Sequence, residues 1–248
     1  MQKIYQNKNL ILSYLKTGDR KNQSIVLLPP GIGEALCFDN LIKKLSQKYF
    51  VIAIDLPGAG KSLKKSKANL KNIAQDVVYF LKDININNPI IIAESYGGSL
   101  AVKISQLIKL QSLVLIGTGE FFNFITKIVF SIIFYKTPHS RRIRKMYAKM
   151  HTKLGTFDFK GYTDHQLKNI SQRWYDIFWF TLPRNYKNSI NTLIIKSKKD
   201  RVVKRKSFKK IENIFVNNRT MELNCSHFDY LKNLEENNYQ EIVEFLEK

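Results

Sequence analysis

The sequence predicts an α/β fold, in which a mostly parallel sheet is flanked by helices and carries a helical insertion. Short buried runs alternate with amphipathic segments along most of the 248 residues, a pattern typical of a parallel sheet covered by helices. The buried runs are missing between residues 121 and 187, which indicates the insertion. Apolar residues make up 44% of the chain, enough to bury a sizeable core and to exclude wholesale disorder.

The predicted elements of the core follow from apolar periodicity. The strands are Leu10–Lys16, Ser24–Leu28, Phe50–Ile54, Pro89–Ala93, Ser112–Ile116, Thr192–Ile195 and Thr220–Leu223. The helices are Phe38–Tyr49, Ile73–Leu81, Leu100–Leu110, a basic segment after Asp200, and Tyr239–Glu247. We therefore expect one α/β core made of residues 1–119 and 188–248.

Residues 120–187 form the predicted helical cap. Both tryptophans and many other aromatic residues fall here, and thirteen Lys and Arg residues stand against three acidic ones between positions 121 and 187. The cap therefore carries about half of the chain's net charge of +21. Lys, Asn and Ile are abundant throughout, so biased composition is one explanation of this charge, and an acidic partner is the other.

The sequence also indicates where the protein acts. The polar residues 1–10 lack the apolar run of a secretory signal. The most apolar stretch, residues 121–135, is shorter than the roughly 20 residues of a membrane-spanning helix. Cys37 and Cys225 give neither a disulfide framework nor a CxxC motif. We expect a cytoplasmic monomer.

The segment Ala93-Glu94-Ser95-Tyr96-Gly97 carries the central chemical signal. A serine with small residues two positions before and after it stands between a buried strand and a helix. Such a sharp turn lifts the hydroxyl clear of the sheet and places the positive end of the next helix near a developing oxyanion. A serine that merely caps the helix is the alternative. The pattern favours Ser95 as a nucleophile.

A nucleophilic serine needs a base, and the base needs an orienting acid. Three of the four histidines lie in the insertion, and only His227 follows the last predicted strand. Asp200 comes just past the preceding strand, so the predicted triad runs Ser95, Asp200, His227. Glu120, which follows the strand Ser112–Ile116, is the alternative acid.

An oxyanion hole needs two donors. The amide of Tyr96 is one, and the amide of Ile32, in the loop Pro30-Gly31-Ile32-Gly33, is the second. Two glycine-rich segments resemble nucleotide-binding motifs but do not match them. The segment 57–62 ends like a phosphate-binding loop, but Asp55 stands where the first glycine of that loop is needed. The segment 31–33 begins like a dinucleotide-binding motif, but Leu36 stands where the last glycine of that motif is needed.

These motifs together resemble the α/β-hydrolase superfamily over nearly the whole chain. The loop at Pro30–Gly33 resembles its oxyanion loop, with Pro30 where a histidine is common. The segment Asp55–Ser62 resembles the Asp-x-x-Gly-x-Gly-x-Ser stretch after its fourth strand, and residues 93–98 resemble its nucleophile elbow. The resemblance implies a serine hydrolase with Asp200 and His227 at the acid and base positions, residues 120–187 as a cap, and no metal or organic cofactor.

The substrate is predicted from the cap. Its aromatic residues indicate an apolar acyl pocket in an esterase or thioesterase, although many of them must also pack the cap onto the core. The residues predicted to bind substrate are Phe122, Trp174, Phe178 and Trp179.

Three narrower alternatives stay open. Carrier-protein methyl esterases of biotin synthesis have this fold, and Arg141, Arg142, Arg144 and Lys145 are suited to docking an acidic acyl carrier protein. A lysophospholipase could use residues 121–135 at an anionic membrane. A catalytically silent binding protein of the same fold is the third, and nucleic acid is not the partner we expect.

Overall fold

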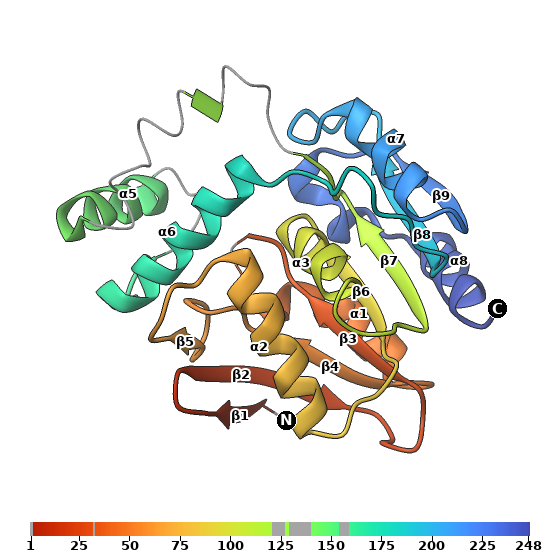
Figure 1. Cartoon of the computed structure of the whole chain (residues 1–248), viewed down its shortest axis with the longest axis horizontal. Coiled ribbons are helices and arrows are strands. Elements are labelled where there is room, and N and C mark those ends of the chain that lie inside the picture. The colour runs from red at the N-terminus through yellow and green to blue at the C-terminus, as the bar shows by residue number, and fades with distance from the viewer. Residues whose placement is uncertain (1, 32, 121–126, 129–139, 154–158) are drawn as a thin grey trace.

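The computed structural model describes residues 2–31, 33–120, 127–128, 140–153 and 159–248 (Figure 1). In this part of the chain, one sheet holds strands in the order β1-β2-β4-β3-β6-β7-β8-β9, and β5 pairs with β2. The strands are β1 (Gln2–Gln6), β2 (Leu10–Thr17), β3 (Ser24–Leu28), β4 (Phe50–Ile54), β5 (Leu63–Lys64), β6 (Ile90–Glu94), β7 (Ser112–Ile116), β8 (Asn191–Ser197) and β9 (Asn218–Leu223). From β4 to β9 every pairing is parallel, as the sequence predicts, and β1 and β5 pair antiparallel with β2.

Helices cover both faces of the sheet. The helices α2 (Leu70–Asp83), α3 (Tyr96–Ile104) and α7 (Arg205–Ile214) share one hydrophobic cluster with it. On the other face, a cluster joins the short helices η1 (Ala35–Phe38) and α1 (Asp39–Leu45) with α8 (Glu236–Leu246). Figure 1 looks onto the side of α2 and α3. The two short helices η2 (His227–Asp229) and η3 (Leu231–Asn233) follow β9.

The central strands are buried on both sides. Every residue of β4, β6 and β7 is buried, and side chains along β6 alternate between the two clusters, with Ile91 and Ala93 on the α2 side and Ile90 and Ile92 on the α1 side. A strand covered by helices on both faces needs apolar residues at every position. For this reason continuous apolar runs located these strands correctly from sequence.

Several features differ from the sequence-based expectation: β5 was not predicted, and α1 ends at Leu45 instead of Tyr49. The polar N-terminus contains the strand β1, which the sequence analysis missed because its residues are mostly exposed and form an edge. The helix expected at Leu100–Leu110 is displaced toward the N-terminus: α3 begins at Tyr96, directly after the turn at Ser95, and ends at Ile104. Ser105 then donates its hydroxyl to the carbonyl of Val102, and turns follow.

The cap lies between β7 and β8, and its described part contains the helices α5 (Arg141–Lys153) and α6 (Asp164–Trp179). Thr163 caps α6 in a reciprocal capping box with Gln166. The side chains of Asn169 and Gln172 accept hydrogen bonds from the amides of Lys64 and Ala68, so α6 is fastened to the loop that leads into α2. In Figure 1, α5 lies at the outer side of α6, away from the sheet.

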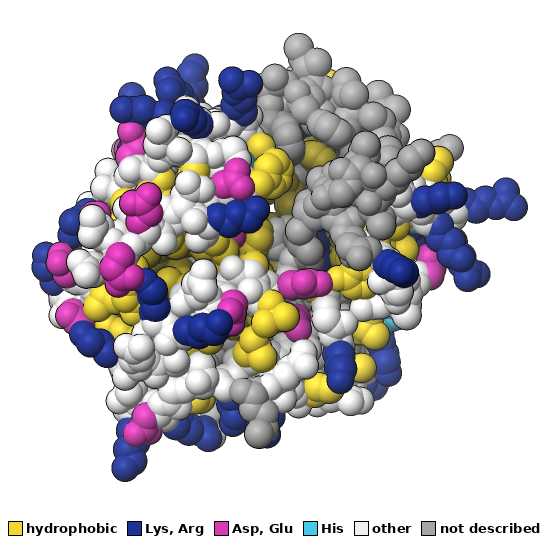
Figure 2. Space-filling view, turned by 180° about the vertical axis from the view of Figure 1, so that it is seen from behind, with side chains coloured by type: hydrophobic (Ala, Val, Ile, Leu, Met, Phe, Trp, Pro, Cys, Tyr) yellow, Lys and Arg dark blue, Asp and Glu magenta, His cyan; other side chains and the backbone are white. Residues whose placement is uncertain are grey.

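The surface is basic over a wide area. Figure 2 shows Lys and Arg side chains spread around one face of the molecule, with acidic side chains among them.

None of the helices that the structure describes combines the length and the apolar character that crossing a membrane requires.

Candidate active site

The turn at Ser95 joins β6 to α3. Ser95 has φ 52° and ψ −113°, a conformation that a residue with a side chain adopts only when its surroundings enforce it. Its amide donates to the carbonyl of Ile116 on the neighbouring strand β7 at 2.8 Å. The chain then turns directly into α3. The strained turn therefore sets the serine hydroxyl at the carboxyl end of the central strand.

Gly97 explains why small residues flank this serine. A Cβ at position 97 would lie 2.1 Å from the carbonyl oxygen of Leu28 and 2.7 Å from that of Pro29. The first turn of α3 thus packs against the end of β3 at a distance that only glycine allows. This contact brings the serine and the loop after β3 together.

The side chains of Ser95, His227 and Asp200 form one hydrogen-bonded chain. Ser95 Oγ lies 3.0 Å from His227 Nε2, and His227 Nδ1 lies 2.8 Å from Asp200 Oδ2. All three residues are buried. They come from the ends of β6, β8 and β9, which lie along one edge of the sheet. The structure therefore brings together the three residues that the sequence predicts as a triad.

Asp200 is held as an anion. Burial by itself raises the pKa of this carboxyl, but its contacts with His227 and with the amides of Val203 and Val202 outweigh burial, so the net pKa is lowered. Both amides donate to Oδ1, at 2.9 and 2.8 Å. An ionised carboxylate can only accept, so His227 Nδ1 carries the proton and Nε2 accepts from the serine hydroxyl.

Tyr230 is a further member of the site that the sequence analysis missed. Its hydroxyl donates to Asp200 Oδ2 at 3.1 Å, beside the bond from His227. Tyr230 is fully buried, and its ring meets the His227 ring edge to face at 6.1 Å. In the sequence, its position three residues after His227 is the one indication that Tyr230 belongs to the site. Tyr230 therefore fixes the position of the acid.

Glu120, the alternative acid, faces other partners. Its carboxylate accepts from the amide of Leu182 at 3.2 Å and from Lys210 Nζ at 2.8 Å. Burial alone raises its pKa, but Lys210 and the Leu182 amide lower it overall. The carboxylate that contacts His227 is that of Asp200.

The structure describes one of the two predicted oxyanion donors, the amide of Tyr96. The amide of Tyr96 opens α3, and the first amides of a helix lack an acceptor within it, so this N–H is available beside Ser95. Ile32 lies outside the described residues. Its neighbours Gly31 and Gly33 are described, and both contact α6.

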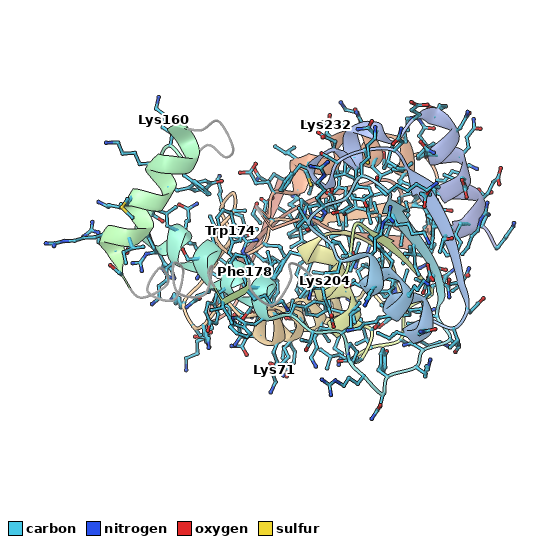
Figure 3. All side chains as sticks on the ribbon, turned by 90° about the horizontal axis from the view of Figure 1, so that it is seen from above. Lys71, Lys160, Trp174, Phe178, Lys204 and Lys232 are labelled. Atoms are coloured by element: carbon cyan, nitrogen blue, oxygen red, sulfur yellow. The ribbon has the colours of Figure 1, made fainter. Side chains whose placement is uncertain are left out.

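The four predicted substrate-binding residues lie in different surroundings. Trp174 is half-buried and donates its indole N–H to the carbonyl of Gly31 at 3.2 Å. Phe178 is buried, and Figure 3 shows both residues where α6 meets the core. Trp179 is 45% exposed and lines a cavity with residues of α2 and α3, such as Leu70 and Lys103, and not with Ser95 or His227. Phe122 lies outside the described residues.

The predicted partner-binding residues all lie on α5. Arg141, Arg142 and Lys145 are exposed. Arg144 is buried and binds Asp164 through Nε at 3.1 Å and Nη2 at 2.7 Å, so it joins α5 to α6 instead of facing a partner. An acidic partner for α5 stays a prediction. Within the described ranges, His, Cys, Asp and Glu side chains form no group of three or more that could hold a metal ion.

Comparison with known proteins identifies the family. A family model described as alpha/beta hydrolase fold matches residues 24–234. A Haemophilus influenzae protein named "Putative esterase/lipase" is 27% identical over 210 residues, which cover 76% of this chain and 71% of that protein. A second relative, the magnesium-chelatase 30 kDa subunit of Rhodobacter capsulatus, is 32% identical over 84 residues, which cover 33% of this chain and 30% of the relative.

Solved structures match over the whole chain. A hydrolase from Pseudomonas aeruginosa superposes with a TM-score of 0.76 at 13% identity, covering 100% of this chain and 98% of its own. An esterase from Exiguobacterium antarcticum superposes with a TM-score of 0.74 at 17% identity, covering 100% of both chains. At such identities, the likeness concerns the fold.

Proposed function

Because the chain belongs to the α/β-hydrolase family, we propose that it is a serine hydrolase that cleaves carboxylic esters through an acyl-enzyme on Ser95. The observation that carries the proposal is the continuous hydrogen-bonded chain from Ser95 through His227 to Asp200. The curated relative named for esterase or lipase activity supports the reaction class. A fold shared by many hydrolases does not by itself fix the substrate.

Acylation begins at the serine hydroxyl. His227 Nε2 accepts the Ser95 proton as Oγ attacks the ester carbonyl, and the anion of Asp200 stabilises the imidazolium that forms. The carbonyl oxygen becomes an oxyanion, which the amide of Tyr96 and the N-terminal end of α3 stabilise, together with the predicted amide of Ile32. His227 then protonates the departing alcohol, and the acyl group stays on Ser95.

Deacylation repeats these steps with water. His227 takes a proton from the water molecule as it attacks the acyl-enzyme, and returns a proton to Ser95 as the carboxylic acid leaves. Apart from the ester and the water molecule, the proposed steps use only groups of this chain. A preference for apolar acyl chains is part of the proposal and rests on the aromatic character of the cap.

The proposal is tested with 4-nitrophenyl esters of increasing acyl length. We expect the wild-type protein to hydrolyse them, with kcat/KM rising from acetate to longer chains, and Ser95→Ala to lower kcat by about 10⁶-fold. The control is Ser99→Ala, one turn further along α3. The Ser99 hydroxyl is buried and has no hydrogen-bond partner among the described residues, so its loss leaves kcat within about twofold. Equal activity of wild type and Ser95→Ala would exclude the mechanism.

A further inference from the structure

The loop after β3 is held from the cap by α6. The carbonyl of Gly31 accepts from the indole N–H of Trp174 at 3.2 Å, and a Cβ at Gly31 would lie 3.2 Å from Cδ1 of Ile177. Two residues of one helix therefore touch the same point of this loop. Neither contact could be predicted from the sequence, in which Gly31 and Trp174 are 143 positions apart.

The bond to Gly31 acts on one peptide unit. The Gly31 carbonyl belongs to the same peptide unit as the next amide along the chain, which is the amide predicted to bind the oxyanion. Ile32 lies outside the described residues, and the Gly31 carbonyl is the end of this unit that the structure describes.

Arg173 supports the loop at its next described residue. Its side chain is fully buried, and a Cβ at Gly33 would lie 2.3 Å from Nη1 and 2.9 Å from Nη2. Gly33 has φ +92°, so both its backbone angle and the guanidinium require glycine there. One buried side chain thus packs against the loop at Gly33.

The core holds the same loop from the opposite side. The amide of Leu56 donates to the carbonyl of Gly33 at 2.7 Å, and the amide of Ala35 donates to Asp55 Oδ1 at 2.8 Å. From the cap, the hydroxyl of Tyr162 donates to Glu34 Oε1 at 2.6 Å. The loop is therefore held between the segment after β4 and the helix α6, in a chain where proline replaces the histidine common at position 30.

We propose that Trp174 is a positioning residue: its hydrogen bond to the Gly31 carbonyl, together with Arg173 against Gly33, holds the loop after β3, and this loop carries the amide predicted to bind the oxyanion. The inference rests on the proposed function and reassigns Trp174 from binding the acyl chain to orienting the oxyanion hole. A donor that is misdirected by a fraction of an ångström stabilises the oxyanion less and leaves ground-state ester binding unchanged.

The test compares Trp174→Phe with the wild type. This change keeps an aromatic ring and removes the N–H. We expect kcat to fall about tenfold, with KM unchanged within about twofold, and binding of a trifluoromethyl ketone, which forms an oxyanion on the serine, to weaken by the same factor. The matched control is Tyr175→Phe, which removes a hydroxyl from the next residue of α6. Successive helix residues point about 100° apart, so it should match the wild type in all three quantities.

Hydrogen exchange gives a readout that does not need activity. The amides of residues 31–35 should exchange faster in Trp174→Phe than in the wild type and in Tyr175→Phe. If the wild type fails to hydrolyse esters, the proposed function falls, and the exchange rates alone then decide about the loop. If Trp174→Phe does not fold, Tyr162→Phe replaces it, with an expected threefold loss in kcat. A raised KM with unchanged kcat, ketone affinity and exchange would overturn the proposal and return Trp174 to the acyl pocket.

Discussion

The edge of the sheet and the cap helix α6 use their side chains in different ways. At the sheet edge, Ser95 and Asp200 both contact His227, and each of the three residues follows a strand. On α6, Trp174 and Arg173 contact backbone of the core. The first region forms one hydrogen-bonded group of side chains, and the second packs against the backbone of the loop after β3. The comparison teaches that aromatic residues of a cap can be structural parts of a site in the core.

The largest effect should separate the two candidate acids. Asp200→Asn removes the acceptor for His227 Nδ1, which favours the wrong tautomer, and we expect kcat to fall by about 10⁴-fold with little loss of stability. Glu120→Gln breaks only the contacts with Leu182 and Lys210, so kcat should change less than twofold. Steady-state kinetics of both variants decides. A larger loss in Glu120→Gln would contradict the assignment.

A second prediction compares a glycine of each region. Gly97→Ala places a Cβ 2.1 Å from the carbonyl of Leu28, so backbone must move, and we expect a loss of about 3 kcal/mol in the free energy of unfolding. Gly161 in the cap has φ +83° but nothing within 4 Å of its Cβ position, so Gly161→Ala should cost about 1 kcal/mol through backbone strain alone. Denaturant unfolding measures both. Equal losses would show that close packing at the turn is not limiting.

A third prediction uses two glutamates with opposite shifts. Burial raises the pKa of Glu94 from 4.5 to about 8. Between these values the folded protein keeps a proton that the unfolded chain releases, so this group lowers stability as the pH rises. Glu94→Gln removes the effect, and we expect its melting temperature to match that of the wild type at pH 4.5 and to exceed it by roughly 5 °C at pH 9.

Glu120→Gln is the control for this titration, because its pKa is shifted the other way. Although burial alone raises it, Lys210 and the Leu182 amide lower it overall, so the ionised carboxyl stabilises the fold at high pH and loses that contribution as the pH falls through its folded pKa. Glu120→Gln should therefore melt below the wild type at pH 9. If both variants melted above the wild type at pH 9, or both below it, the opposite pKa shifts assigned to Glu94 and Glu120 would be contradicted.

The smallest expected effect concerns Tyr230. Tyr230→Phe leaves the His227 bond to Asp200 intact and removes the second donor to Oδ2. We expect kcat to fall about fivefold and stability to fall by about 1 kcal/mol. Kinetics at saturating substrate together with thermal unfolding checks both quantities. An unchanged kcat would mean that His227 and the amides of Val202 and Val203 suffice to hold the acid.

Sequence alone predicted the sheet and the three side chains that meet at its edge, because both follow from local patterns. Buried parallel strands are continuous apolar runs, and in a parallel sheet the residues after each strand meet at one edge. Ser95, Asp200 and His227 were found in this way.

The contacts of the cap could not be predicted from sequence. Nothing near Trp174 or Arg173 in the chain indicates that they face Gly31 and Gly33, because such pairs arise only when the cap folds over the core. The edge strand β1 was missed for a related reason, since an exposed strand needs no apolar pattern. Arg144 was predicted as a surface charge for the same reason, because its bond to Asp164 joins two helices of the cap.

The central claim is that Ser95 is the nucleophile, and covalent labelling tests it most directly. The wild-type protein is treated with a fluorophosphonate, digested, and mapped by mass spectrometry. We predict one adduct per chain, on Ser95, and none in Ser95→Ala. An unlabelled wild-type protein, or an adduct on another residue that persists in Ser95→Ala, would contradict the account.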